Sequence, residues 1–287
     1  MRIQYVILFT IVAMIALTGC DKESGQKIPS YIHIDTIRMR ENPNVDEGSI
    51  SHNITDAWLY VDNQFIGVFE LPATIPVLEE GKKKVVVRPG IMMNGISSTR
   101  IPYPFFKEYT LESVMLEKEE IDTLQPVVEY VDDIAIPFRE DFEGESLHMT
   151  YKDSDTTFII ENNQPYEGIG SGKVVLEGSK LLFQAVSDTS YKLPYQGQSV
   201  FLELNFKTNT NVSTGLIAIT DQGENHRPIV GLNPTDHWKK IYINLTHTIG
   251  SSYPTRNFKV FLSILRKDDE PEAEVYFDNL KVIHLDE

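Results

Sequence analysis

The stretch AEVYFDNLKVIHL, residues 273–285, is the strongest indicator of the fold class. It is rich in β-branched and aromatic residues, and its apolar and polar side chains alternate as in a strand with one buried face. Six similar runs precede it: KVVLEG (173–178), KLLFQAV (180–186), SVFLELNFK (199–207), TGLIAIT (214–220), KKIYINLT (239–246) and NFKVFLSIL (257–265). Seven such runs within about 150 residues predict a β-sandwich or jelly roll over residues 138–287.

The preceding half of the chain also predicts strands. AWLYV (57–61) and FIGVF (65–69) flank a short polar turn, which is typical of a hairpin. Further strands are predicted at 73–78, 83–88 and 109–117. No apolar stripe of helical period persists for three turns after residue 20. The sequence therefore predicts an all-β chain with two domains.

Turn residues give the first domain a recognisable order. A hairpin, a Leu71-Pro72 turn, Gly81, alternating valines and Pro89-Gly90 follow one another within residues 56–100. This order resembles PEGA-like and other small immunoglobulin-like β-sandwich modules of bacterial envelope proteins. The resemblance implies a sandwich at 30–128 that acts as a spacer or a partner-binding surface without catalytic residues, and a linker at 129–137.

The aromatic segment RIPYPFF, residues 100–106, allows two interpretations. Exposed aromatic side chains on a proline-restrained backbone would form a recognition loop. We expect instead that Tyr103, Phe105 and Phe106 close the core of the first domain, because large apolar side chains are usually buried.

The N-terminus predicts secretion. Residues 3–17 are almost entirely apolar and follow Arg2, the pattern of a signal peptide. Leu17-Thr18-Gly19-Cys20 resembles the bacterial lipobox, in which the thiol is acylated, for example with palmitate, and the chain is cut before the cysteine. The resemblance implies removal of residues 1–19, a lipid on Cys20 and a polar tether at 20–29. Asp21-Lys22-Glu23 is similar to the export signals of Bacteroidetes lipoproteins, so we expect an outer-membrane protein of the cell envelope, its face left open.

Composition excludes several function classes. The net charge is −16, and the 26 Lys and Arg residues form no sizeable cluster, so nucleic acid is not an expected partner. Cys20 is the only cysteine, so the mature chain has no thiol for a disulfide or a catalytic nucleophile. The sequence also contains no G-x-S-x-G, H-E-x-x-H, P-loop or dinucleotide motif. We expect no enzymatic activity.

Both ends of the second domain carry a further resemblance. REDFEG (139–144), YFDNLKV (276–282) and WKKIYINL (238–245) are similar to the jelly rolls of carbohydrate-binding modules and galactose-binding-like domains. In many of these modules a structural calcium ion joins the first and last strands through carboxylate and carbonyl oxygens. The positions that match are Glu143 and Asp278, with Asp141 as a third ligand. Alternatively, these acids face solvent at strand ends.

The same resemblance implies a glycan ligand. Sugar rings stack their C–H faces on aromatic side chains. The candidate contacts are Tyr166, Tyr191, Tyr195 and Tyr253, with His226 and Arg227 as hydrogen-bond donors. Trp238 is expected in the core at the entrance to its strand. Jelly rolls offer two surfaces for sugars, the concave face and the loop end, and the sequence leaves both open.

Three functions follow, in decreasing order of support. The first is a membrane-anchored lipoprotein that binds a glycan without catalysis. The second is an assembly or adhesion lipoprotein that binds another envelope protein. The third is a glycoside hydrolase, which needs two carboxylates facing each other across a cleft. The acids of EDFEGE (140–145) do not match the strand pattern of laminarinase-like jelly-roll enzymes.

Overall fold

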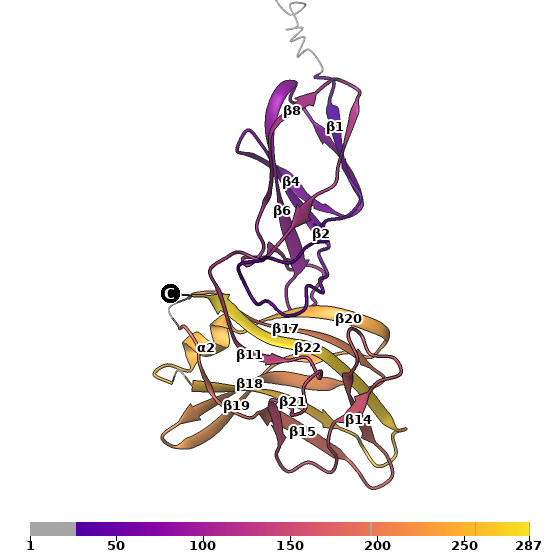
Figure 1. The fold of residues 1–287 in the computed structure, drawn as a ribbon, viewed down its shortest axis with the longest axis vertical. Coiled ribbons are helices and arrows are strands. Elements are labelled where there is room, and N and C mark those ends of the chain that lie inside the picture. The colour runs from indigo at the N-terminus through magenta and orange to yellow at the C-terminus, as the bar shows by residue number, and fades with distance from the viewer. Residues whose placement is uncertain (1–26, 196, 256, 287) are drawn as a thin grey trace, which may run out of the picture.

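The structure is a computed structural model that describes residues 27–286 except 196 and 256. Almost every element is a β-strand, and one short helix, α2 (Thr246–Ser251), is present in the described part. Figure 1 shows two β-domains stacked along the long axis. The prediction of an all-β chain is confirmed. Cys20, the predicted signal peptide and most of the predicted tether lie outside the described residues, and no helix in the described part is long and apolar enough to cross a membrane.

The first domain is built from ten strands in three sheets. They are β1 (Ser30–Ile34), β2 (Arg38–Met39), β3 (Asp56–Val61), β4 (Gln64–Glu70), β5 (Ala73–Val77), β6 (Gly81–Met92), β7 (Arg100–Pro102), β8 (Tyr109–Leu116), β9 (Ile121–Leu124) and β10 (Val127–Val128). One sheet has the order β4-β3-β6-β7 with β8 also paired to β6, the second is β5-β1-β9, and the third is β10-β2. The predicted hairpin is β3–β4, and Asp62 and Asn63 in its turn both have positive φ, as a two-residue hairpin turn requires.

The core of the first domain includes the aromatic segment. Tyr103, Phe105 and Phe106 are buried, and the Tyr103 ring packs edge-on against Phe105 with centroids 5.2 Å apart. The expectation that these residues close the core is confirmed. Both ends of the predicted linker at 129–137 are part of the folded domains. Tyr130 is fully buried in the same core and packs against Phe106, and residues 134–137 belong to a strand, β11 (Ile134–Glu140).

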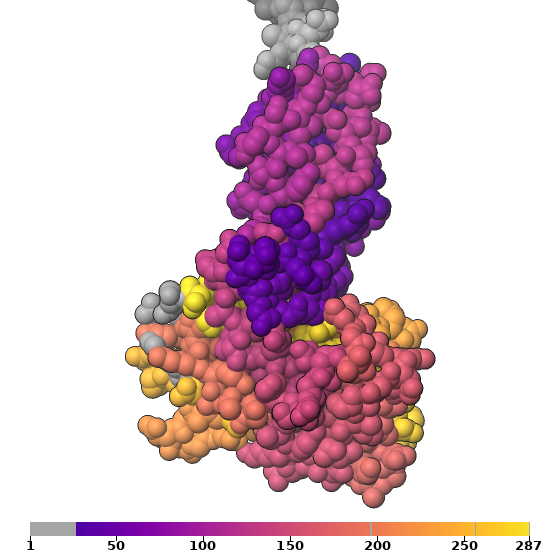
Figure 2. Space-filling model, viewed as in Figure 1, coloured from indigo at the N-terminus to yellow at the C-terminus, as the bar shows by residue number. Residues whose placement is uncertain are grey.

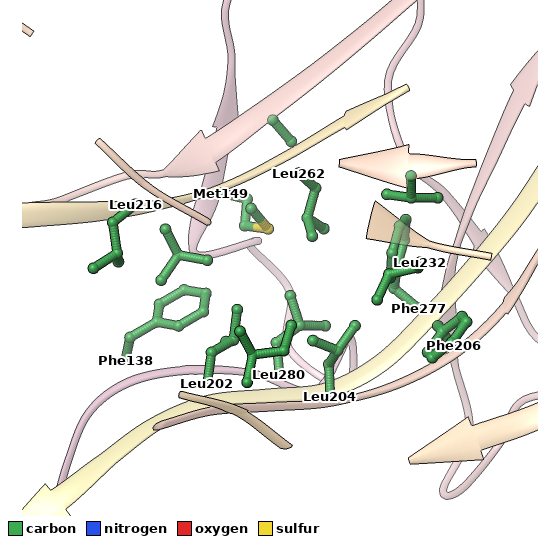
Figure 3. Packing of buried hydrophobic residues seen from close by; sticks show 14 of the residues in the cluster. Phe138, Met149, Leu202, Leu204, Phe206, Leu216, Leu232, Leu262, Phe277 and Leu280 are labelled. Atoms are coloured by element: carbon green, nitrogen blue, oxygen red, sulfur yellow. The ribbon is translucent and has the colours of Figure 1, made fainter. Parts of the chain in front are cut away.

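The second domain contains the remaining twelve strands. They are β11 (Ile134–Glu140), β12 (Met149–Tyr151), β13 (Ile159–Glu161), β14 (Ser171–Leu176), β15 (Leu182–Ser187), β16 (Tyr191–Lys192), β17 (Val200–Thr208), β18 (Val212–Thr220), β19 (Gly223–Leu232), β20 (Thr235–Asn244), β21 (Asn257–Leu265) and β22 (Ala273–Leu285). One sheet has the order β13-β14-β22-β17-β20 with β11 also on β22; the other has the order β12-β15-β21-β18-β19 with β16 also on β21. The main core lies between these sheets, where Leu202, Leu204, Phe277 and Leu280 pack together (Figure 3).

The first domain lies on the outer face of the sheet that contains β17, β20 and β22 (Figure 1). Three second-domain residues, Phe201, Tyr242 and Ile283, belong to the hydrophobic core of the first domain. Met93 forms a bridge with Tyr242, and the Asn94 N–H donates to the Tyr242 carbonyl at 2.8 Å. The outer face of this sheet therefore forms part of the core of the first domain. The space-filling view shows the narrow first domain seated on the wider second one (Figure 2).

Candidate functional site

The outer face of this sheet is only partly covered. On β17, residues 201, 203, 205 and 207 alternate with core residues and so face outward. Phe201 and Glu203 are buried beneath the first domain, whereas Lys207 is half-buried beyond its edge. Trp238 on β20 and Tyr276 on β22 lie on the same open part of the sheet.

Three aromatic rings meet on this open part. Trp238 lies 5.4 Å from Tyr166 and 6.1 Å from Tyr276, both measured between ring centroids. All three side chains are half-buried, so each keeps part of its surface in contact with solvent. We call Tyr166, Trp238 and Tyr276 the aromatic row. Neighbouring rings are inclined by 61° and 63°, so the row is not one flat platform, but it offers separate ring faces on which sugar rings can stack.

Two lysines lie against the aromatic row. The Lys207 ammonium is 4.4 Å from the centroid of Tyr276 and 6.0 Å from that of Trp238. Lys173 lies 5.1 Å from the Tyr276 centroid and forms an ion pair with Glu274 at 2.9 Å. Hydrogen bonds to Tyr276 and Glu274 raise the pKa of Lys173. The row therefore has cations at close range, and these cations hold the Tyr276 ring in place.

A cavity of about 570 Å³ opens beside Trp238, between the two domains. We call it the interdomain cavity. The first domain contributes His52, Asn53, Thr55, Met92, Asn94 and Gly95 to its walls, and the second contributes Tyr166, Phe206, Gly231, Leu232, Asn233, His237, Trp238, Lys239, Lys240 and Ile241. These residues include amides, imidazoles, ammonium groups and aromatic rings, but among the described lining residues there is no Asp or Glu.

His52 lines this cavity and has one unpaired ring nitrogen. Its Nδ1 is buried and has no hydrogen-bond partner among the described residues. Burial lowers the pKa of His52, and the charge of Lys240 lowers it further, so the imidazole is neutral at neutral pH. A neutral imidazole has one donor and one acceptor, which is the combination that a hydroxyl group satisfies.

A cluster of buried charged residues lies next to the cavity and shares Lys240 with its lining. The Glu203 carboxylate lies 2.9 Å from the Lys240 ammonium and 3.9 Å from that of Lys281, and it accepts hydrogen bonds from the hydroxyls of Tyr103 at 2.6 Å and Tyr130 at 3.0 Å. We call these five residues the Glu203 cluster. Burial opposes ionisation of Glu203, but the two lysines and Tyr103 outweigh it, and its pKa is lowered. The cluster joins the domains directly behind the cavity.

Of the residues predicted as ligand contacts, only Tyr166 lies in this site. Tyr195 and Tyr253 stack on each other near α2 with ring centroids 5.5 Å apart, and Tyr253 is 66% exposed. His226 and Arg227 lie on β19 in the other sheet. Tyr191 packs against the core through Phe138. The predicted contacts thus lie in four separate places.

The expectation that Trp238 packs in the core is wrong. Ile241 and Ile243 face the core from the same strand, so strand alternation places Trp238 with Lys240 and Tyr242 on the outer face. The sequence analysis also missed Tyr276. The core residues Val275 and Phe277 flank it, so strand alternation turns Tyr276 to the outer face as well. Strand parity was the signal in the sequence that would have located both rings.

The predicted calcium ligands are only partly together. Asp141 lies 3.9 Å from the Arg139 guanidinium and accepts a hydrogen bond from the Glu143 N–H. Glu143 accepts the N–H groups of Ile169 and Gly170, and its charge acts on Asp278. No three His, Cys, Asp or Glu residues in the described part form a group that could hold a metal. Of the three predicted ligands, Glu143 and Asp278 interact through their charges, and the calcium ion stays a prediction.

Comparisons with known proteins give no family. No family model and no curated protein matches the chain. Among solved structures, the CBM22-1 xylan-binding domain of Xyn10C from Paenibacillus barcinonensis is 12% identical, with a TM-score of 0.39 over 53% of this chain and 96% of that one. A family 30 carbohydrate-binding module from Clostridium thermocellum is 12% identical, with a TM-score of 0.35 over 52% and 92%. The enzymatically active domain of tailspike protein 4 from bacteriophage CBA120 is 8% identical, with a TM-score of 0.37 over 50% and 20%.

Proposed function

We propose that this chain binds a glycan, without catalysis, along the aromatic row and into the interdomain cavity. The observation that carries the proposal is the row of three half-buried rings, Tyr166, Trp238 and Tyr276, two of which, Tyr166 and Trp238, also line the interdomain cavity. Aromatic faces stack on the C–H faces of sugars, and a small number of fixed polar groups then selects the hydroxyls.

Polar groups suited to hydroxyls line the cavity next to Trp238. His52 contributes a neutral imidazole. Asn53 and Asn94 each use one amide atom to bond β20, and the other amide atom of each has no partner in the described part of the chain. Amide and neutral imidazole groups both donate and accept hydrogen bonds, as does each sugar hydroxyl. The cavity volume of about 570 Å³ is within the usual range for small-molecule sites.

The same lining supports binding rather than hydrolysis. A glycoside hydrolase places two carboxyl groups on either side of the scissile bond. The described residues that line the interdomain cavity include no carboxylate, so this cavity lacks that pair. Glycan binding is accordingly the activity that we assign to it.

The cellular setting of the proposal rests on the sequence. We propose that a lipid on Cys20 anchors the chain to the outer membrane of the cell envelope, as the lipobox resemblance implies. The first domain would then separate the glycan site from the membrane, because the described chain begins at the end of that domain farthest from the second one (Figure 1).

The test compares an aromatic residue of the row with one that lies outside the site. A fragment comprising residues 21–287 is applied to a glycan array, and the glycans that bind are titrated against the Trp238→Ala and Tyr253→Ala variants. We expect Trp238→Ala to weaken binding by about tenfold to a hundredfold, since it removes the central ring of the row. Tyr253→Ala removes an exposed ring outside the site and should leave affinity unchanged. Binding that survives Trp238→Ala, or an array without any bound glycan, would contradict the proposal.

One observation favours the second function, docking onto another envelope protein. The edge strand β13 exposes Ile159 and Ile160, and Ile169 nearby is also exposed. Apolar residues on an unpaired sheet edge offer a surface to another protein. An array without bound glycan would make this edge the leading candidate.

A further inference from the structure

The charged residues that line the interdomain cavity have the opposite sign to the charge of the whole chain. The chain carries a net charge of −16. The interdomain cavity nevertheless has two lysines, Lys239 and Lys240, and no Asp or Glu among its described lining residues. Lys207 extends the positive charge along the aromatic row.

Two lysines at the surface of the site are outside any direct ion pair in the described part of the chain. Neither Lys207 nor Lys239 has a carboxylate within 4.0 Å in the described part of the chain. The nearest acids are already engaged: Glu274 binds Lys173 and the Tyr276 hydroxyl. Likewise, Asp236 lies 2.7 Å from the His237 ring. The charges of Glu274 and Asp236 still act on Lys207 and Lys239, but a ligand does not have to break a direct ion pair to reach these two ammonium groups.

The Glu203 cluster adds further positive charge next to the cavity. The Glu203 cluster contains one carboxylate and two ammonium groups, Lys240 and Lys281, and all three side chains are almost completely buried. Burial lowers the pKa of Lys281 to about 8, so it remains mostly protonated at neutral pH. The five residues of the cluster therefore carry a net charge of about +1, which the buried Glu47 near Lys281 partly offsets. A buried charge is screened less by solvent than an exposed one.

We propose that the site binds anionic glycans, those with uronic acid or sulfate groups, in preference to neutral ones. This inference rests on the proposed function and narrows its ligand class. The aromatic row stacks the sugar rings, and Lys207 attracts acid groups there. Lys239, which strand alternation turns to the opposite face of β20 from Trp238, attracts them at the cavity wall. An anionic polymer would otherwise be repelled by the chain as a whole, so the local reversal of charge selects for it.

The test uses matched pairs of glycans. Polygalacturonate, alginate and glucuronoxylan are each compared with the same material after reduction of its carboxyl groups, and sulfated polysaccharides are compared before and after desulfation. We expect the anionic member of at least one pair to bind at least tenfold more tightly, with affinity falling as salt rises from about 0.05 to 0.5 M. The two kinds of pair separate carboxylate from sulfate as the preferred group.

Two charge-reversal variants provide the control. Lys239→Glu changes the charge in the site, and Lys82→Glu makes the same change at the far end of β6, roughly 30 Å along the strand from Met92 in the cavity wall. Lys239→Glu should weaken anionic binding about tenfold, and Lys82→Glu should leave it within about twofold.

The outcomes distinguish this inference from the function on which it rests. Neutral glycans that bind as tightly as their anionic forms, or equal effects of the two variants, would overturn the charge preference and leave glycan binding standing. Failure of every glycan to bind would overturn both.

Discussion

Asp278 is the described carboxyl group whose environment most clearly predicts a pH effect on stability. It is almost fully buried, accepts hydrogen bonds from the Ser171 hydroxyl and the Asn279 N–H, and lies near Glu143. Burial, with a smaller contribution from the charge of Glu143, raises its pKa to about 6. The folded chain therefore binds this proton more tightly than the unfolded chain does.

The sign of the pH effect follows directly. Below about pH 4 the group is protonated in both states, and between pH 4 and 6 the unfolded chain ionises first, so stability falls as pH rises. We expect a loss of up to about 3 kcal/mol in the free energy of unfolding across this range, because two pKa units correspond to that amount. Asp278→Asn should remove this component of the pH dependence in urea denaturation between pH 4 and 8. An unchanged slope, or an equal change in the exposed control Asp268→Asn, would refute it.

The same variant addresses the calcium ion predicted from the sequence. A cation between Glu143 and Asp278 would favour the ionised form of Asp278 and so lower its pKa. If the ion binds, calcium at pH 7 stabilises the wild-type chain relative to a chelator, and Asp278→Asn loses that stabilisation. Equal stability of the wild-type chain in calcium and in chelator would exclude an ion at this pair.

The sequence predicted the kind of site, an aromatic stacking surface, better than it predicted which residues form it. Aromatic side chains on a β-domain predicted a stacking surface, but the chosen tyrosines lie in loops and strands on several sides of the molecule. Position within a sheet depends on strand pairing between distant segments, which composition does not encode. Parity along 235–244 and 273–277 would have found Trp238 and Tyr276, because the core residues of those strands are recognisable in the sequence.

Among the elements, strands with a strong apolar pattern were predicted well. The bounds of β21 and β22 agree with the predicted runs 257–265 and 273–285. β19 was missed because the first six of its ten residues are exposed, so GENHRPIVGL carries little apolar signal. It forms by pairing with β18, a tertiary contact. α2 was missed because six residues are too few for a helical period.

The edge strand β20 depends on the first domain for its outer hydrogen bonds. Lys240 O accepts the Asn53 amide at 3.3 Å, and the Asn244 N–H donates to the Asn94 side chain at 2.8 Å. Asn94 also donates its own N–H to Tyr242 O. An unpaired edge strand invites association with other chains, and here two asparagines cover part of it.

Asn94 allows this contact to be measured. It has a φ of +57°, a conformation that Asn tolerates and Ala does not. Asn94→Ala should cost about 2 kcal/mol, from the lost hydrogen bond to Asn244 and the backbone strain. Asn94→Gly removes the same hydrogen bond without the strain and should cost about 1 kcal/mol. Urea denaturation without ligand measures both, and equal losses would show that backbone strain contributes nothing.

On the scale of the whole molecule, the two domains share buried charge as well as apolar surface. Tyr103 and Tyr130 of the first domain donate hydrogen bonds to Glu203 of the second. In the opposite direction, Lys281 of the second domain donates to the carbonyls of Glu47 and Ser49 in the first, at 2.9 and 3.0 Å. Separating the domains would expose Phe201 and leave these charges with fewer partners. The sequence predicted two domains with a linker, and it gave no sign of this interface because its partners lie far apart along the chain.

This shared interface predicts that the two domains unfold together. The chain has two tryptophans, Trp58 in the first domain and Trp238 in the second. Trp238→Phe therefore leaves a single fluorescent reporter in the first domain, and Trp58→Phe leaves a single one in the second. We expect the two variants to give coincident urea transitions, because the unfolding of either domain would expose the interface residues of the other.

Glu203→Gln leaves Lys240 and Lys281 without their carboxylate and should lower the free energy of unfolding by about 3–5 kcal/mol. When added to each reporter variant, it should also move the two transitions apart. Different midpoints in the two reporter variants that retain Glu203 would show that the domains unfold independently. A glycan site built from both domains would then lack the fixed geometry on which its proposed affinity depends.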